Sequence, residues 1–82
     1  MKKRHKIASY YAIFEPAGKG RYSVSFPDFP GCVTYGNNFE HAKKMGEEVL
    51  ELWIEELAAS KTEIPESSEY PVVDVLKVAV PV

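Results

Sequence analysis

The chain has 82 residues, of which 45% are hydrophobic and 27% are charged, and its formal net charge is −2. This length allows one small domain over residues 1–82 and excludes a multidomain enzyme. The single cysteine excludes an internal disulfide and is typical of a protein in a reducing cytoplasm. One cysteine and two histidines also argue against a metal site. No apolar run is long enough to cross a membrane.

The first 26 residues predict a basic arm followed by a β-hairpin. Residues 1–6 are rich in lysine and arginine and are interpreted as a flexible arm. Residues 9–14 are apolar on both alternating sets, which is typical of a strand that is buried on both faces. Residues 16–20 have the composition of a turn, and residues 22–26 alternate between apolar and polar side chains. The two strands should therefore pair antiparallel.

Residues 26–32, Phe-Pro-Asp-Phe-Pro-Gly-Cys, form the most rigid connection in the chain. Pro27 and Pro30 fix their own φ angles and remove two backbone donors, while Gly31 can adopt a positive φ at no steric cost. One interpretation is a structural corner that buries Phe26, Phe29 and Cys32. The other is a recognition loop that displays Asp28 and Phe29 to a partner, because rigid loops commonly carry binding residues.

A short third strand over residues 32–35 precedes a long amphipathic helix. Asn37 and Asn38 are both good N-caps, so the helix is predicted over residues 39–59. Its apolar stripe should pack on the sheet and contains Ala42, Met45, Val49, Leu50, Leu52, Trp53, Ile54 and Leu57. The opposite face is charged and is either simply solvated or a partner surface, for which we name Glu48, Glu51 and Glu55.

A polar loop over residues 60–71 leads to the β-branched segment 72–80, which predicts a fourth strand. The chain is therefore expected to be α+β with element order β-β-β-α-β. The last strand should lie parallel to the first after a right-handed crossover, which makes the spatial order 3-2-1-4 with the helix on one face. Because the first and last strands are apolar on both faces, we expect a homodimer or tetramer that covers the second face.

These residues resemble the HicB-like antitoxin family. The similarity rests on the strand at 10–14, the segment 22–36 with its Pro-Asp-Phe-Pro-Gly-Cys core, the helix pattern at 40–50 and the Ile-Pro pair at 64–65. The resemblance implies a partial RNase H-like fold and a role in neutralising a HicA-type toxin, a small mRNA-cleaving interferase. His41 and the Asn37-Asn38 pair depart from the usual family pattern of a glutamate and an Asp-Thr pair. Many members carry a C-terminal DNA-binding segment, and since this sequence ends at Val82, direct DNA binding is not expected.

Catalysis is not expected, and no cofactor or metal is predicted. An RNase H-type site needs clustered carboxylates, whereas Glu15, Asp28 and Asp74 come from three separate places. We therefore expect a toxin-neutralising binding protein. The alternative is a small oligomeric nucleic-acid-binding module that uses the basic arm, with steeply salt-dependent affinity.

Overall fold

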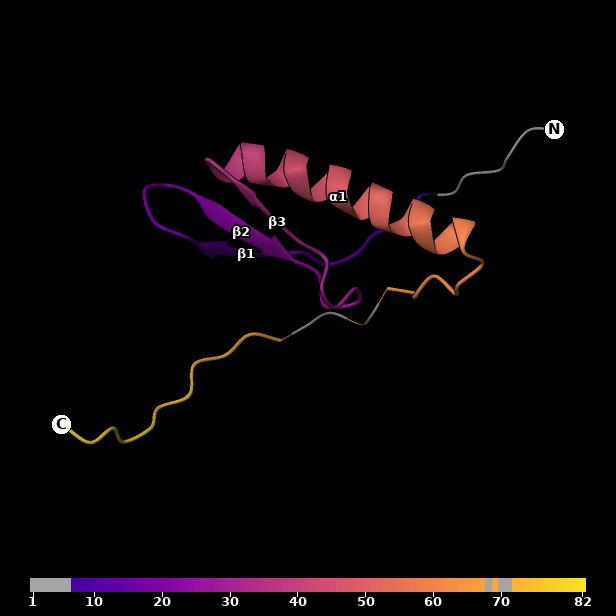
Figure 1. The fold of residues 1–82 in the computed structure, drawn as a ribbon. Coiled ribbons are helices and arrows are strands. Elements are labelled where there is room, and N and C mark those ends of the chain that lie inside the picture. The colour runs from indigo at the N-terminus through magenta and orange to yellow at the C-terminus, as the bar shows by residue number, and fades with distance from the viewer. Residues whose placement is uncertain (1–6, 68, 70–71) are drawn as a thin grey trace.

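The computed structural model describes residues 7–67, 69 and 72–82, and shows a three-stranded antiparallel sheet covered by one helix (Figure 1). The strands are β1 (Ile13–Pro16), β2 (Tyr22–Ser25) and β3 (Val33–Gly36), and the helix is α1 (Phe39–Ala59). The sheet order β1-β2-β3 confirms the predicted meander. The predicted basic arm at residues 1–6 lies outside the described residues.

A tight hairpin joins β1 to β2. Three successive residues at 18–20 have positive φ angles, and the Arg21 N–H donates to the Gly18 carbonyl at 2.9 Å. The ladder pairs Ile13 with Ser25 and Pro16 with Tyr22. β1 thus begins four residues later than predicted, because β2 ends at Ser25 and residues 9–12 have no strand opposite them.

The helix begins and ends where the sequence predicts, and its caps explain both limits. The Asn38 side chain accepts a hydrogen bond from the His41 backbone N–H at 2.8 Å, as an N-cap should. At the other end Lys61 has a φ of 57°, and the Thr62 N–H donates to the Leu57 carbonyl at 2.8 Å. This is the bond pattern that closes a helix with a left-handed residue, here a lysine in place of the usual glycine.

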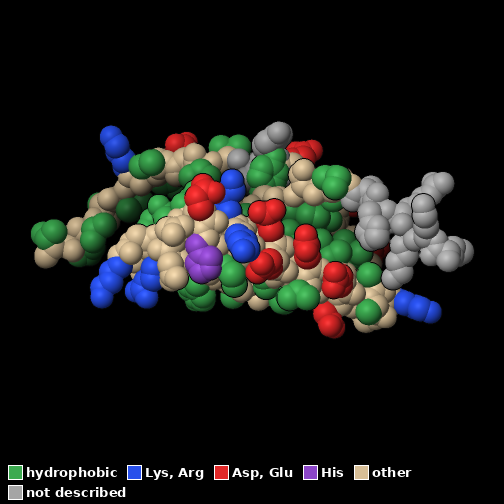
Figure 2. Space-filling model, turned by 90° about the horizontal axis from the view of Figure 1, so that it is seen from above, with side chains coloured by type: hydrophobic (Ala, Val, Ile, Leu, Met, Phe, Trp, Pro, Cys, Tyr) green, Lys and Arg blue, Asp and Glu red, His purple; other side chains and the backbone are tan. Residues whose placement is uncertain are grey.

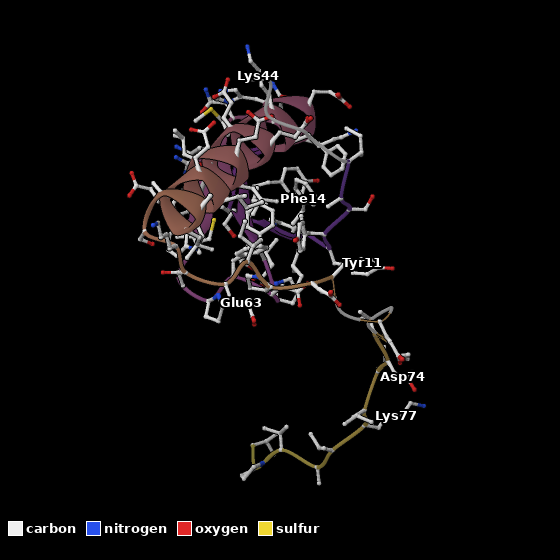
Figure 3. The ribbon with its side chains drawn as sticks, turned by 90° about the vertical axis from the view of Figure 1, so that its right-hand side faces the viewer. Tyr11, Phe14, Lys44, Glu63, Asp74 and Lys77 are labelled. Atoms are coloured by element: carbon white, nitrogen blue, oxygen red, sulfur yellow. The ribbon has the colours of Figure 1, made fainter. Side chains whose placement is uncertain are left out.

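The core lies between α1 and the inner face of the sheet, with α1 packed mainly over β3 and β2. Val24 and Ala42 are fully buried, and the Phe14 ring lies beneath the helix (Figure 3). A Cβ on Gly36 would overlap the backbone of Ala42, so the start of α1 lies directly against the end of β3. Leu52, which the sequence assigns to the apolar stripe, is 62% exposed, because it lies on the flank of the helix, beyond the sheet.

The predicted fourth strand is not seen. Residues 72–82 form an extended segment that leaves the domain, and the described part of it has no strand partner (Figure 1). Asp74 and Lys77 accordingly lie on a segment well away from the helix and sheet (Figure 3). A β-strand requires a neighbour for its backbone donors and acceptors, and β-branched composition alone does not supply one. The spatial order 3-2-1-4 is therefore corrected to a sheet of three strands.

Candidate partner-binding surfaces

The corner at residues 26–32 turns inward. The Phe29 N–H donates to the Phe26 carbonyl at 3.1 Å, and the Cys32 N–H donates to the Phe29 carbonyl at 3.0 Å. This repeat places every third side chain on the same side, so that Phe26, Phe29 and Cys32 are 6%, 2% and 1% exposed. Of the two interpretations of this segment, the structure shows the structural corner, because these three side chains lie in the core.

Phe29 is the centre of contacts that join distant parts of the chain. Its ring meets the Tyr10 ring edge-on with centroids 4.8 Å apart, and the Tyr10 hydroxyl donates to the Pro65 carbonyl at 2.6 Å. The interaction ties the segment before β1 to the segment after α1. The prediction that Phe29 is displayed to a partner is corrected, because a ring this buried has no surface to offer. Asp28 beside it is half-buried.

Gly31 adopts a φ of 92°, a conformation that favours glycine, as the sequence predicts for this corner. A Cβ built on it would lie 3.6 Å from the Trp53 ring. The corner therefore passes close beneath the second half of α1. Pro27 and Pro30, which belong to the same corner, are exposed to solvent.

Two groups that could carry chemistry instead serve the structure. Burial raises the pKa of the Cys32 thiol, so the sulfur stays protonated at neutral pH and packs as a small hydrophobe. The His41 Nδ1 accepts a hydrogen bond from the Asn37 backbone N–H at 2.9 Å, which adds a second bond to the helix cap. Within the part of the chain that the structure describes, no group of three or more His, Cys, Asp or Glu side chains gathers around a potential metal position.

The outward face of α1 carries the exposed Lys43 and Lys44 in its first half and is acidic beyond them. Figure 2 shows carboxylates gathered along the helix, and the exposed ones are Glu40, Glu47, Glu48, Glu51, Glu55 and Glu56. The three predicted partner residues of the helix, Glu48, Glu51 and Glu55, all belong to this set. The sequence missed Leu52, which is exposed at spacings of three and four from Glu48, Glu55 and Glu56 and so shares their side of the helix. We call Glu48, Glu51, Leu52, Glu55 and Glu56 the acidic helix surface.

A second exposed surface is the sheet face opposite α1. The register sets Ile13, Ser25 and Val33 in one row across the strands, and Glu15, Ser23 and Tyr35 in the next. Ile13, Val33 and Tyr35 are 45%, 54% and 66% exposed. This face is mixed, because Ile13, Val33 and Tyr35 lie at its edges together with the charged Glu15 on β1, and two serines of β2 lie in the middle.

Residues 10–76 match the sequence family described as HicB_like antitoxin of bacterial toxin-antitoxin system. The chain belongs to the HicB-like antitoxin family. The match covers all three strands, the corner, the helix and the first part of the exposed segment after it. The predicted resemblance is confirmed over nearly the same residues. No curated protein and no solved structure gives a significant match.

No helix among the described residues is long and apolar enough to cross a membrane.

Proposed function

We propose that this HicB-like protein neutralises a HicA-type mRNA interferase by covering the surface on which the toxin binds RNA. The observation that carries the proposal is the acidic helix surface on a domain of an antitoxin family. A protein that binds and cleaves RNA presents cationic side chains to the phosphate backbone. Carboxylates held on a rigid helix complement such a surface and compete with RNA for it.

Leu52 adds an apolar side chain among the glutamates of the acidic helix surface. Its side chain is 62% exposed and is therefore accessible to a partner. An apolar side chain ringed by charged groups matches the usual organisation of an interface anchor, in which the rim excludes water and the centre supplies affinity. We therefore propose that Leu52 enters an apolar depression on the toxin, while Glu48, Glu51 and Glu55 contact its cations. We also propose that Asp28, which is half-buried at the corner, contacts the toxin.

The direct test is co-expression with a HicA-type toxin, taken from the adjacent reading frame if that frame encodes a small basic protein, with growth and RNA cleavage as readouts. We expect a stable complex, relief of growth arrest and loss of cleavage. A folded chain that forms no complex and leaves growth arrested would overturn the proposal. Salt-dependent RNA binding in that case would favour the nucleic-acid-binding alternative.

Two variants separate the charged rim from the apolar centre. Glu48→Lys with Glu55→Lys should slow association by about 10-fold at low salt, with a smaller effect at physiological ionic strength. The control is Glu63→Lys with Glu66→Lys, which changes the net charge equally at exposed positions after the helix. Leu52→Ala should instead speed dissociation by about 10-fold. Equal effects of the two double variants would show that only the total charge matters.

We further propose that the protein acts as a non-enzymatic, cofactor-free homodimer or tetramer in the cytoplasm. The buried, protonated Cys32 suits a reducing compartment, and the exposed apolar segment 72–82 supports self-association. Cleavage of an RNA–DNA hybrid that depends on a divalent metal, and that Asp28→Asn or Asp74→Asn abolishes, would contradict the non-enzymatic role.

A further inference from the structure

A hollow lies at one end of the sheet, away from the surface assigned to the toxin. It has a volume of about 330 Å³ and is lined by Ala17, Arg21, Tyr35, Gly36 and Asn37. These residues bring together the β1–β2 hairpin and the turn between β3 and α1, which lie at the same end of the domain (Figure 1). Neither the acidic helix surface nor the segment 72–82 contributes a residue to the hollow. It is therefore a separate place at which a ligand can bind.

The register of the sheet places the polar side chains of this hollow on one face. Tyr22 pairs with Gly36, and the Tyr22 ring faces α1, where it meets the Phe39 ring. Because side chains alternate along a strand, Arg21 and Tyr35, the neighbours of this pair, lie on the opposite face of the sheet. A guanidinium and an aromatic ring thus share the open face beside each other.

Arg21 is held in place and is still able to bind. Its Nε donates to the Gly18 carbonyl at 3.3 Å, and its backbone N–H donates to the same carbonyl at 2.9 Å. Within the described residues this is the one hydrogen bond of the side chain, so the two terminal nitrogens keep their donors for a ligand. A guanidinium matches the oxygens of a phosphate with parallel hydrogen bonds. Arg21 can therefore hold a phosphate at the edge of the hollow.

Tyr35 and Asn37 supply the groups that recognise a base. The Tyr35 side chain is 66% exposed, and no other ring of the described residues contacts it. The Asn37 backbone N–H is used by the His41 Nδ1, but its exposed side-chain amide offers both donors and an acceptor. Unpaired bases in RNA stack on aromatic side chains and present their edges to such polar groups, while the backbone follows nearby cations.

We propose that this hollow binds one nucleotide of a single-stranded RNA. The base stacks on Tyr35 with its edge toward the Asn37 amide, and a phosphate pairs with Arg21. The volume is near the lower end for small-molecule sites, which suits a single nucleotide unit. Glu15 lies in the same row of the sheet as Tyr35 and opposes a phosphate further toward β1. The inference concerns RNA and does not depend on the toxin or on residues 1–6.

The test is binding of a short fluorescein-labelled oligoadenylate RNA to the full chain, followed by fluorescence anisotropy over a range of salt concentrations. Tyr35→Ala should weaken binding by about 10-fold, whereas Tyr35→Phe keeps the ring and should retain the affinity. Arg21→Gln should lower the slope of affinity against salt by about 0.7 on logarithmic axes, because one phosphate contact is lost. Glu15→Gln should tighten binding, because it removes a repulsive charge. Circular dichroism checks that each variant is folded.

Three controls separate this site from general attraction of charge. Lys44→Gln removes one positive charge at an exposed position of α1 and should weaken binding much less than Arg21→Gln. Lys2→Gln with Lys3→Gln tests the basic arm in the same way. The labelled strand annealed to oligouridylate should bind much more weakly, because a paired base cannot stack on Tyr35. Unchanged affinity in Tyr35→Ala, equal losses from Lys44→Gln and Arg21→Gln, or equal binding of the duplex would overturn the proposal.

Discussion

The domain at residues 10–65 and the segment at residues 72–82 contain the same kinds of side chain in opposite surroundings. Val24 in β2 is 0% exposed, whereas Val78 in the segment is 77% exposed. Both belong to segments that predict strands, Val24 through the alternation of apolar and polar residues at 22–26 and Val78 through the β-branched composition of 72–80. The difference is that β2 has β1 and β3 beside it and α1 above it, while the segment has no strand partner among the residues that the structure describes. Strand-forming composition therefore marks where a ladder can form, and the neighbours decide whether it does.

The largest loss of stability among these predictions is expected from a substitution of Phe29, at the centre of the domain. Phe29→Ala should lower the free energy of unfolding by about 3–5 kcal/mol, because it leaves a cavity beside Tyr10. For a domain of this size that is much of the total stability. Urea unfolding followed by circular dichroism measures it, with Phe29→Leu as the milder control. An unchanged midpoint would mean that the ring is not part of the core.

A matched pair of substitutions compares the regions directly. Val24→Ala should cost about 2 kcal/mol, because it removes buried apolar groups and leaves a gap against α1. Val78→Ala should leave the unfolding of the isolated chain unchanged, since its side chain is already in water. Both are measured by urea titration at a concentration low enough to keep the chain monomeric. Equal losses would indicate that residues 72–80 fold onto their own domain.

A substitution at Gly31, in the corner at residues 26–32, should have a smaller effect on stability. Gly31→Val should destabilise the domain by roughly 1–2 kcal/mol, because a β-branched residue is strained at a φ of 92°. Gly31→Asn should recover part of the loss, since asparagine tolerates left-handed backbone. Melting temperatures of the three proteins give the order. If asparagine were as costly as valine, contact with Trp53 would outweigh backbone strain.

The smallest effect is expected at the start of α1. Asn38→Ala removes the acceptor for the His41 N–H and should cost about 1 kcal/mol. Asn38→Asp keeps an oxygen at the same place and should be nearly neutral. Thermal unfolding followed at the helical signal compares them. A loss as large for aspartate as for alanine would show that the cap bond is not what holds this helix end.

The candidate site was only partly predictable from the sequence. The glutamates of α1 were found because helical spacing separates them from the apolar stripe, and this spacing is a local property. Leu52 was placed in the core because its spacing fits the edge of that stripe. Which edge of a wide stripe meets the sheet depends on where α1 crosses it, and this crossing is set by close contacts such as that of Ala42 with Gly36. The sequence contains no local signal for it.

By itself the sequence determined the hairpin, the corner, the order of the first three strands and both ends of the helix. These features follow from glycine and proline geometry, hydrophobic period and capping, all of which act over a few neighbouring residues. Only the tertiary structure decided that Phe29 is a core residue and not a displayed one, since the corner's inward turn depends on the Tyr10 ring and Pro65 carbonyl from distant parts of the chain. It also decided that residues 72–80 are not a strand of this chain's own sheet, because a strand is defined by its hydrogen-bonded neighbour and not by its own residues.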